Sequence, residues 1–187
     1  MSDIRAEEDN LKIGGYFVLF NDETELYDGI FETVDSRALD KTLKNDIRCL
    51  FNHDPSLVLG RTKPNTLKLE RDEKGLYGEV IINPNDKEAV SVYERVKRGD
   101  IDQCSFGFNI LDEEHKLDER NQLHVTLKEI DLHEVSIVTF PAYPNTSVSA
   151  RAKQLEDLKG QRLEARKKVM LERIRNGVKK LSPSEEA

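Results

Sequence analysis

The 187-residue chain has few of the residues that build disulfide-linked, membrane-spanning or metal-binding proteins. Two cysteines make no disulfide framework, and no apolar run approaches the length of a membrane span. Cys-x-x-Cys, His-Glu-x-x-His and glycine-rich phosphate-loop motifs are absent from the sequence, which argues against zinc and nucleotide chemistry. The polar, acidic N-terminus has no apolar signal-peptide core. We therefore expect a protein that is made and used inside a reducing cell.

Charge, in contrast, is abundant and unevenly distributed. Charged residues make up 35% of the chain, and the net charge is −7. Residues 151–187 hold 11 Lys or Arg against 6 Asp or Glu, so residues 1–150 carry a net charge of −12. An acidic body argues against a specific nucleic-acid-binding core. The basic segment could contact an acidic surface, or it could simply be a solvated helix face.

The pattern divides the chain into three parts: a flexible leader (1–11), one folded domain (12–150) and a basic amphipathic helical tail with a disordered end (151–187). Short apolar runs separated by turn residues predict about eight strands between residues 13 and 140. Two helices are expected among them, over 38–43 and from Asp86 to about Lys97, where Gly99 ends the second. This pattern predicts a β-rich α+β domain with a closed or nearly closed barrel.

A hydroxyl, an imidazole and a carboxylate occur in three separate strand-like segments. Ser105 lies in DQCSFGF (102–108), His53 in FNHDP (51–55) and Glu134 in HEVSIVTFPAYP (133–144). A serine hydrolase needs these three groups as nucleophile, general base and orienting acid. Taken alone, each residue also fits an ordinary role, such as a serine on the polar face of a strand or a surface histidine beside Asp54. A carboxylate in an apolar strand is less ordinary, because burial is unfavourable unless it is paired.

Alternation along a strand places Ser105 on the same face as Gly107 and turns Cys104 to the opposite face. Gly107 would leave room beside the hydroxyl for a substrate backbone. Cys104 is the rival nucleophile, but on the core side we expect it to pack as a small apolar residue. Backbone groups near Gly60-Arg61 and Gly107 are candidate oxyanion donors. Arg61 could also hold a substrate carbonyl, or simply pair with an acidic residue.

The other histidines are weaker candidates for the base. His115 lies in a charged loop, and His124 has no supporting motif around it. A metal site built from His53, His133 and Glu134 is disfavoured, because adjacent strand residues point to opposite faces.

Five motifs surround these residues in one order: NHDPS (52–56), LGRT (59–62), KRGD (97–100), SFGF (105–108) and EVSIVTFPAYP (134–144). In this order they closely resemble the prohead (capsid maturation) proteases of tailed bacteriophages, over about residues 13–151. The resemblance implies a serine protease related in fold to the herpesvirus assembly proteases, and hence a herpesvirus-protease-like β-barrel.

The resemblance also implies roles for the residues. Ser105 would be the nucleophile and His53 the general base. The phage family favours Glu134 as the third member. Herpesvirus assembly proteases use a second histidine there, so His133 stays an alternative, and Asp54 is a third possibility with awkward geometry next to His53.

The implied activity is that of a serine endopeptidase without a cofactor. Its expected substrates are scaffold and major capsid protein segments, and the enzyme itself. We expect it inside the immature prohead in the host cytoplasm, with possible homo-oligomers and with no membrane or specific nucleic-acid partner. The alternative is a non-enzymatic capsid assembly module that uses the C-terminal helix, although the presence of all three candidate catalytic residues argues against it.

Overall fold

Two β-sheets and one flanking α-helix make up the body of the protein. The computed structural model describes residues 4–7, 11–140, 159–172 and 175. The first sheet has the order β1-β2-β8-β7 and contains β1 (Arg5–Glu7), β2 (Lys12–Leu19), β7 (Leu67–Arg71) and β8 (Gly75–Ile81). The second has the order β3-β4-β10-β5-β6, with β9 also paired to β10. It contains β3 (Thr24–Tyr27), β4 (Ile30–Val34), β5 (Arg48–Phe51), β6 (Asp54–Arg61), β9 (Gln103–Leu117) and β10 (Leu123–Val138).

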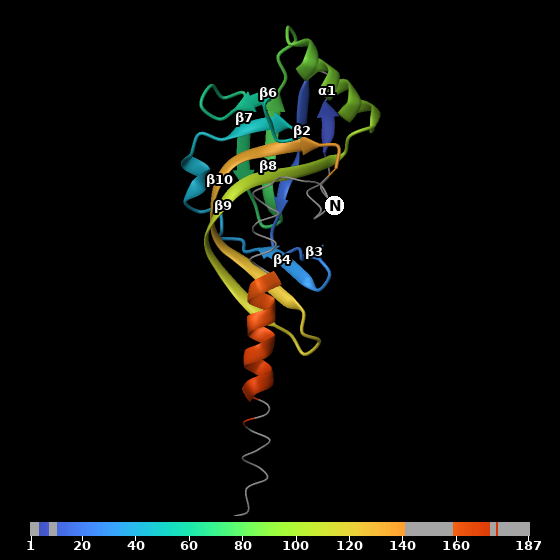
Figure 1. Ribbon diagram of the computed structural model, residues 1–187. Coiled ribbons are helices and arrows are strands. Elements are labelled where there is room, and N and C mark those ends of the chain that lie inside the picture. The colour runs from blue at the N-terminus through green and yellow to red at the C-terminus, as the bar shows by residue number, and fades with distance from the viewer. Residues whose placement is uncertain (1–3, 8–10, 141–158, 173–174, 176–187) are drawn as a thin grey trace, which may run out of the picture.

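β9 and β10 form a long curved hairpin through the second sheet (Figure 1). On its other edge, β10 pairs in parallel first with β4 and then with β5. Three register shifts interrupt the β9–β10 ladder, and bulges of this kind bend a strand and increase its twist. The sequence predicts two strands, over 123–130 and 132–140, where the structure has the single strand β10, because the bulges absorb the irregular stretch without ending the pairing.

The helix α1 (Lys87–Arg98) begins and ends at the predicted residues. The Asp86 side chain accepts hydrogen bonds from the backbone N–H groups of Glu88 and Ala89, and Gly99 ends the helix with a left-handed φ of 81°. The helix predicted over 38–43 is wrong: turns lead into the short 3₁₀ helix η1 (Thr42–Lys44). A tertiary contact explains the difference, because the buried Thr42 hydroxyl accepts a hydrogen bond from the backbone N–H of Leu132 at 2.7 Å.

The apolar core lies between the two sheets and under α1. It includes Ile13 and Phe17 of β2, Val80 of β8, and Val135 and Ile137 of β10, all buried. The predicted β-rich α+β class is confirmed. The described strands pair into two sheets that do not close on each other, so the herpesvirus-protease-like barrel stays a prediction.

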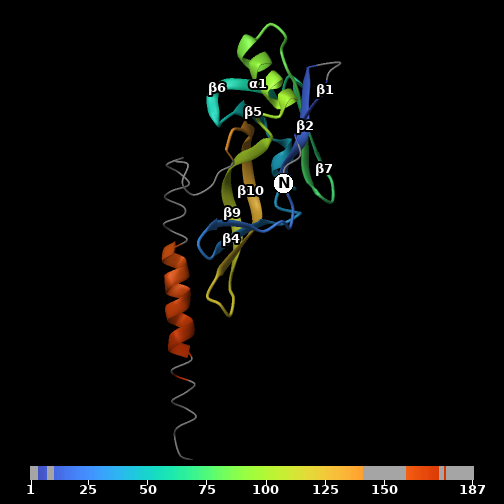
Figure 2. The ribbon, with the colours of Figure 1, turned by 90° about the vertical axis from the view of Figure 1, so that its right-hand side faces the viewer.

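Segments outside the predicted domain also have structure. Residues 5–7, expected in the leader, form β1 and pair with β2. Residues 159–172 are helical, and this C-terminal helix lies alongside the lower half of the β9–β10 hairpin (Figure 2). Arg162 donates to the backbone carbonyls of Asn121 at 3.0 Å and Asp28 at 2.6 Å. The domain boundaries remain a prediction, and the PAYP turn and the disordered end lie outside the described residues.

None of the helices in the described ranges is both long and apolar enough to cross a membrane.

Asp35 joins the end of β4 to β10 and gives the fold a pH-dependent contact. The backbone N–H of Arg37 and the ammonium of Lys128 (Nζ–Oδ2 3.0 Å) hold the pKa of the Asp35 carboxyl below its ordinary value. Because the folded-state pKa is depressed, the stabilisation is present above the unfolded pKa and disappears as pH falls through the folded pKa.

We therefore expect Asp35→Asn to lower the free energy of unfolding by roughly 1 kcal/mol at pH 7. The difference from wild type should shrink below about pH 4, where the unfolded-state carboxyl is protonated. Urea titrations at pH 7, 5 and 3 measure this dependence. Asp22→Asn is the matched control, since Asp22 is exposed and lies between β2 and β3; an equal loss of stability at all three pH values would contradict the role of the Asp35 charge.

Candidate active site

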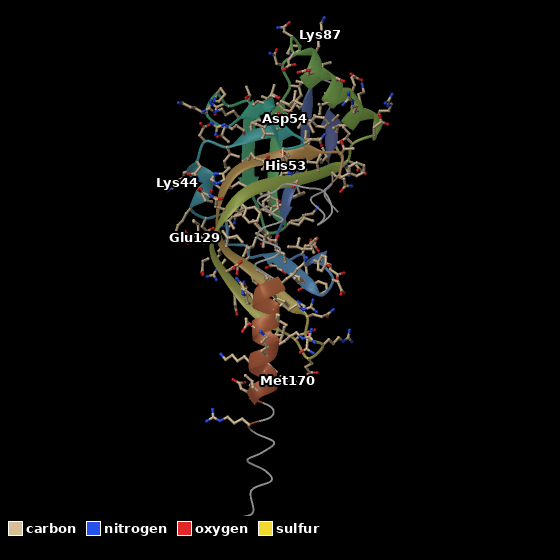
Figure 3. All side chains as sticks on the ribbon, viewed as in Figure 1. Lys44, His53, Asp54, Lys87, Glu129 and Met170 are labelled. Carbon is tan, nitrogen blue, oxygen red and sulfur yellow. The ribbon has the colours of Figure 1, made fainter. Side chains whose placement is uncertain are left out.

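His53 lies in a tight turn at one end of the second sheet. Phe51 and Asp54 are paired in the β5–β6 ladder, so only Asn52 and His53 connect the two strands. Both have positive φ, 52° and 59°, as a two-residue type I′ hairpin requires, and Asn and His tolerate this conformation better than most residues. Figure 3 shows His53 and Asp54 in the upper part of the body, near the upper half of the β9–β10 hairpin.

Asn52 connects this turn to the end of β10 through two hydrogen bonds. Its backbone N–H donates to the carbonyl of Ile137 at 2.9 Å, and its side-chain Oδ1 accepts from the backbone N–H of Thr139 at 2.9 Å. The His53 backbone is therefore held relative to the strand that carries Glu134, which limits the positions that the imidazole can take.

The His53 ring contacts the carboxylate of Glu134. Nδ1 of His53 lies 2.7 Å from Oε1 of Glu134, and the two side chains are 25% and 13% exposed. A carboxylate at Nδ1 favours the tautomer with the proton on Nδ1, which leaves the lone pair of Nε2 available to accept a proton. The pair therefore has the arrangement of an oriented general base.

Ser105 lies on the same sheet face as Glu134. In the β9–β10 ladder Ser105 is directly opposite Ser136, and Gly107 is opposite Glu134. Ser105 and Glu134 are thus diagonal cross-strand neighbours, a relationship that separates their backbones by roughly 7–8 Å. Within the described residues no hydrogen bond joins the Ser105 hydroxyl to His53, and such bonds in apo enzymes commonly tighten only when substrate binds.

Gly107 makes room for a carboxylate. A Cβ added there would lie 2.3 Å from Oε1 of Glu134, far inside contact distance. The Glu134 carboxylate therefore lies in the space beside Gly107, and the expectation that this glycine makes room for a substrate backbone stays a prediction. The glycine allows the carboxylate to lie across β9 and reach His53.

Ser105 and the two alternative nucleophiles near it are all buried. Cys104 faces the core, and burial, with a further contribution from Cys49, raises the pKa of the Cys104 thiol well above its usual range. A thiol with a raised pKa is a poor nucleophile. Ser136 is fully buried, and its hydroxyl donates to Oε2 of Glu134 at 2.5 Å. Ser105, at 6% exposure, is the more accessible of the two serines.

Arg61 pairs with Asp46. Its Nε donates to Asp46 Oδ1 at 2.7 Å and its Nη2 to the other carboxylate oxygen. The guanidinium hydrogen bonds hold the pKa of Asp46 below its ordinary value. The structure therefore agrees with the ion-pair alternative for Arg61, and gives no support to a contact with a substrate carbonyl.

The other candidates for the third member face different partners. His133 is exposed at the register shift between Leu132 and Glu134, with Nε2 3.9 Å from Asp131. The Asp54 carboxylate accepts from the Ser56 hydroxyl and backbone N–H, which together lower its pKa. Neither group is paired with the His53 ring.

His115 of β9 and His124 of β10 lie near the tip of the hairpin, and each is paired with an acidic residue. His115 Nε2 lies 2.9 Å from Glu113, and His124 Nδ1 lies 2.6 Å from Glu23. Each imidazole has a local carboxylate partner of its own.

Two contributors to this site, Asn52 and Ser136, were not identified as such from sequence. The Glu-x-Ser spacing of Glu134 and Ser136 places both side chains on one strand face, so a local signal for Ser136 exists. The Asn-His pair between two strands is likewise a type I′ turn signal. The pairing and register of β5, β9 and β10, which bring these residues together, cannot be predicted from the local sequence.

Comparison with known proteins identifies the family of the chain. A family model described as caudovirus prohead serine protease matches residues 1–161, a span that contains His53, Ser105 and Glu134. No curated protein and no solved structure gives a significant match to the chain. The matched span covers both sheets, α1 and the whole β9–β10 hairpin. The chain belongs to the family of caudovirus prohead serine proteases.

Proposed function

We propose that this protein is a serine endopeptidase in which Ser105 is the nucleophile, His53 the general base and Glu134 the acid that orients the base. The observation that carries the proposal is the 2.7 Å contact between His53 Nδ1 and Glu134 Oε1, on the sheet face that Ser105 shares. Family membership supports the reaction class, and the contact supports the assignment of the residues.

The first half of the reaction is acylation. Nε2 of His53 takes the proton of the Ser105 hydroxyl as Oγ attacks the scissile carbonyl carbon. The resulting imidazolium is stabilised by the Glu134 carboxylate at Nδ1. His53 then gives its proton to the departing amine, the C–N bond breaks, and the N-terminal part of the substrate remains as an ester on Ser105.

The second half is hydrolysis of that ester. His53 takes a proton from a water molecule, the water oxygen attacks the ester carbonyl, and the proton returns to Ser105 Oγ as the acid product leaves. The chemistry consumes one water and needs no cofactor. Backbone N–H groups near Gly60-Arg61 and Gly107 stay the candidate donors to the oxyanion.

The substrates we propose are scaffold and capsid-protein segments inside the immature prohead, together with the enzyme itself. Family membership is the support for this setting. The prohead assembles in the host cytoplasm, so the enzyme would act there on chains packed at high local concentration, a condition that favours weak association between copies.

A fluorophosphonate probe tests the active-site assignment without a known substrate. The full-length protein is incubated with the probe at several protein concentrations, and the adduct is mapped by peptide mass spectrometry. We expect one adduct, on Ser105, and a loss of labelling by about 10³-fold or more in His53→Ala, because the hydroxyl then lacks its base.

His133→Ala is the matched control, because His133 lies next to Glu134 but is exposed and faces Asp131, so the substitution should leave labelling unchanged. An adduct on Cys104 or Ser136 would reject Ser105 as the nucleophile. Absence of any adduct at all concentrations would favour the non-enzymatic capsid assembly module.

A further inference from the structure

Each oxygen of the Glu134 carboxylate has its own partner, and the proposed reaction accounts for only one of these two contacts. Oε1 faces His53 at 2.7 Å, whereas Oε2 accepts a hydrogen bond from Ser136 Oγ at 2.5 Å. Ser136 lies two residues after Glu134 on β10, so both side chains project from the same face of the strand.

The surroundings of Ser136 make a hydroxyl at this position unusual. Ser136 has 0% exposure, and its neighbours along the strand, Val135, Ile137 and Val138, are apolar and also buried. An apolar residue would suit such an environment on packing grounds, because a buried hydroxyl is unfavourable without a hydrogen-bond partner. The partner of this hydroxyl is the Glu134 carboxylate.

The carboxylate has two donors for its two oxygens. A carboxylate with 13% side-chain exposure loses most of its water and needs protein donors instead. If the Ser136 hydroxyl were missing, Oε2 would lose its donor, and the carboxylate could rotate about its last torsion. Gly107, on the neighbouring strand, has no side chain that would confine the carboxylate against such a rotation.

We infer that Ser136 is a positioning residue for the reaction: its hydroxyl fixes the Glu134 carboxylate so that Oε1 stays on Nδ1 of His53. This inference rests on the proposed roles of Ser105, His53 and Glu134. Among the described residues, the hydrogen bond of the Ser136 hydroxyl goes to Glu134 and not to Ser105 or His53, so in this inference Ser136 acts through the carboxylate. Its removal should therefore change the rate of the chemical step and leave substrate binding unchanged.

A double-mutant cycle with the fluorophosphonate probe tests the inference. Ser136→Ala is expected to lower the labelling rate of Ser105 about tenfold, the effect typical of one hydrogen bond to a charged group. In a Glu134→Gln background the same substitution should have almost no further effect, because the group through which Ser136 acts has already been changed.

Two conservative variants distinguish the effect of the Ser136 hydroxyl on the labelling rate from the effect of side-chain packing. Ser136→Thr retains the hydroxyl and should keep most of the rate, and Ser136→Cys keeps the size with a weaker donor and should give an intermediate rate. The melting temperature of each variant shows whether it is folded, and the Cys variant replaces the Thr variant if the added methyl group prevents folding.

The outcomes distinguish this inference from the proposed function. Labelling of Ser105 at equal rates in wild type and Ser136→Ala would overturn the positioning role and leave the proposed function intact. Equal, additive losses in the wild-type and Glu134→Gln backgrounds would also overturn it, because they indicate a general packing effect. Absence of labelling on Ser105 in the wild type would overturn the proposed function and this inference with it.

Discussion

Co-expression of Ser105→Ala with the cognate capsid protein is expected to leave that protein uncleaved, whereas the wild-type enzyme should process it to a defined shorter mass. The hydroxyl is the only group at position 105 that can form the acyl-enzyme, and alanine cannot replace it. Removal of a serine nucleophile typically lowers the chemical rate by on the order of 10⁴-fold or more. Intact mass spectrometry of the capsid protein measures both the extent of cleavage and its position.

The neighbouring residue supplies the control. Cys104→Ala should still cleave, because the Cys104 thiol is buried in the core with a raised pKa and points away from Ser105. If Ser105→Ala still cleaves the capsid protein and Cys104→Ala does not, the nucleophile is Cys104 and not Ser105. Cleavage at the same position in both variants would indicate another protease in the sample.

The second large effect is expected from Gly107→Ala, which adds only one methyl group. The new Cβ would lie 2.3 Å from Glu134 Oε1, so the carboxylate has to move away from the His53 ring. The imidazolium formed during the reaction would then lose its stabilising charge. We expect the turnover number to fall by about 10² to 10³-fold, with the fold retained.

The kinetic pattern decides between two roles for this glycine. If Gly107 made room for a substrate backbone, alanine would raise KM and leave kcat unchanged, whereas displacement of Glu134 lowers kcat. Gly160→Ala is the matched control, because a Cβ at Gly160 meets no atom within 4 Å in the C-terminal helix. A Gly107→Ala enzyme with unchanged kcat would contradict the position of Glu134 described here.

The sequence predicts best the features that depend on local chemistry. The ends of α1 were predicted from Asp86 and Gly99, and the structure has the cap and the left-handed residue at those positions. The helix predicted over 38–43 failed because a pattern with only three apolar residues is too short to compete with tertiary contacts, here the hydrogen bond between Thr42 and Leu132.

The site itself could be predicted only in part. Ser105, His53 and Glu134 were named from their motifs, but their proximity depends on strand pairing between segments far apart in the chain. Glu134 and His53 are 81 residues apart, and nothing in the local sequence around either one specifies the other. The contact between Gly107 and the Glu134 carboxylate could not be predicted for the same reason, since the atom that lies beside the glycine comes from the neighbouring strand.

The β9–β10 hairpin determines where the site tolerates insertions and deletions. A change of length within the strands near Ser105 should disrupt the site, whereas a change at the hairpin tip should not. Ser105 and Glu134 belong to opposite strands of one hairpin, and side chains alternate faces at every residue. Deletion of a single residue on the Ser105 side of the bulges would turn the hydroxyl to the core face, while a longer connection over residues 118–122 would leave the pairing near Ser105 unchanged. A protease engineered from this fold should therefore accept added sequence at the hairpin tip far more readily than a one-residue change in either strand.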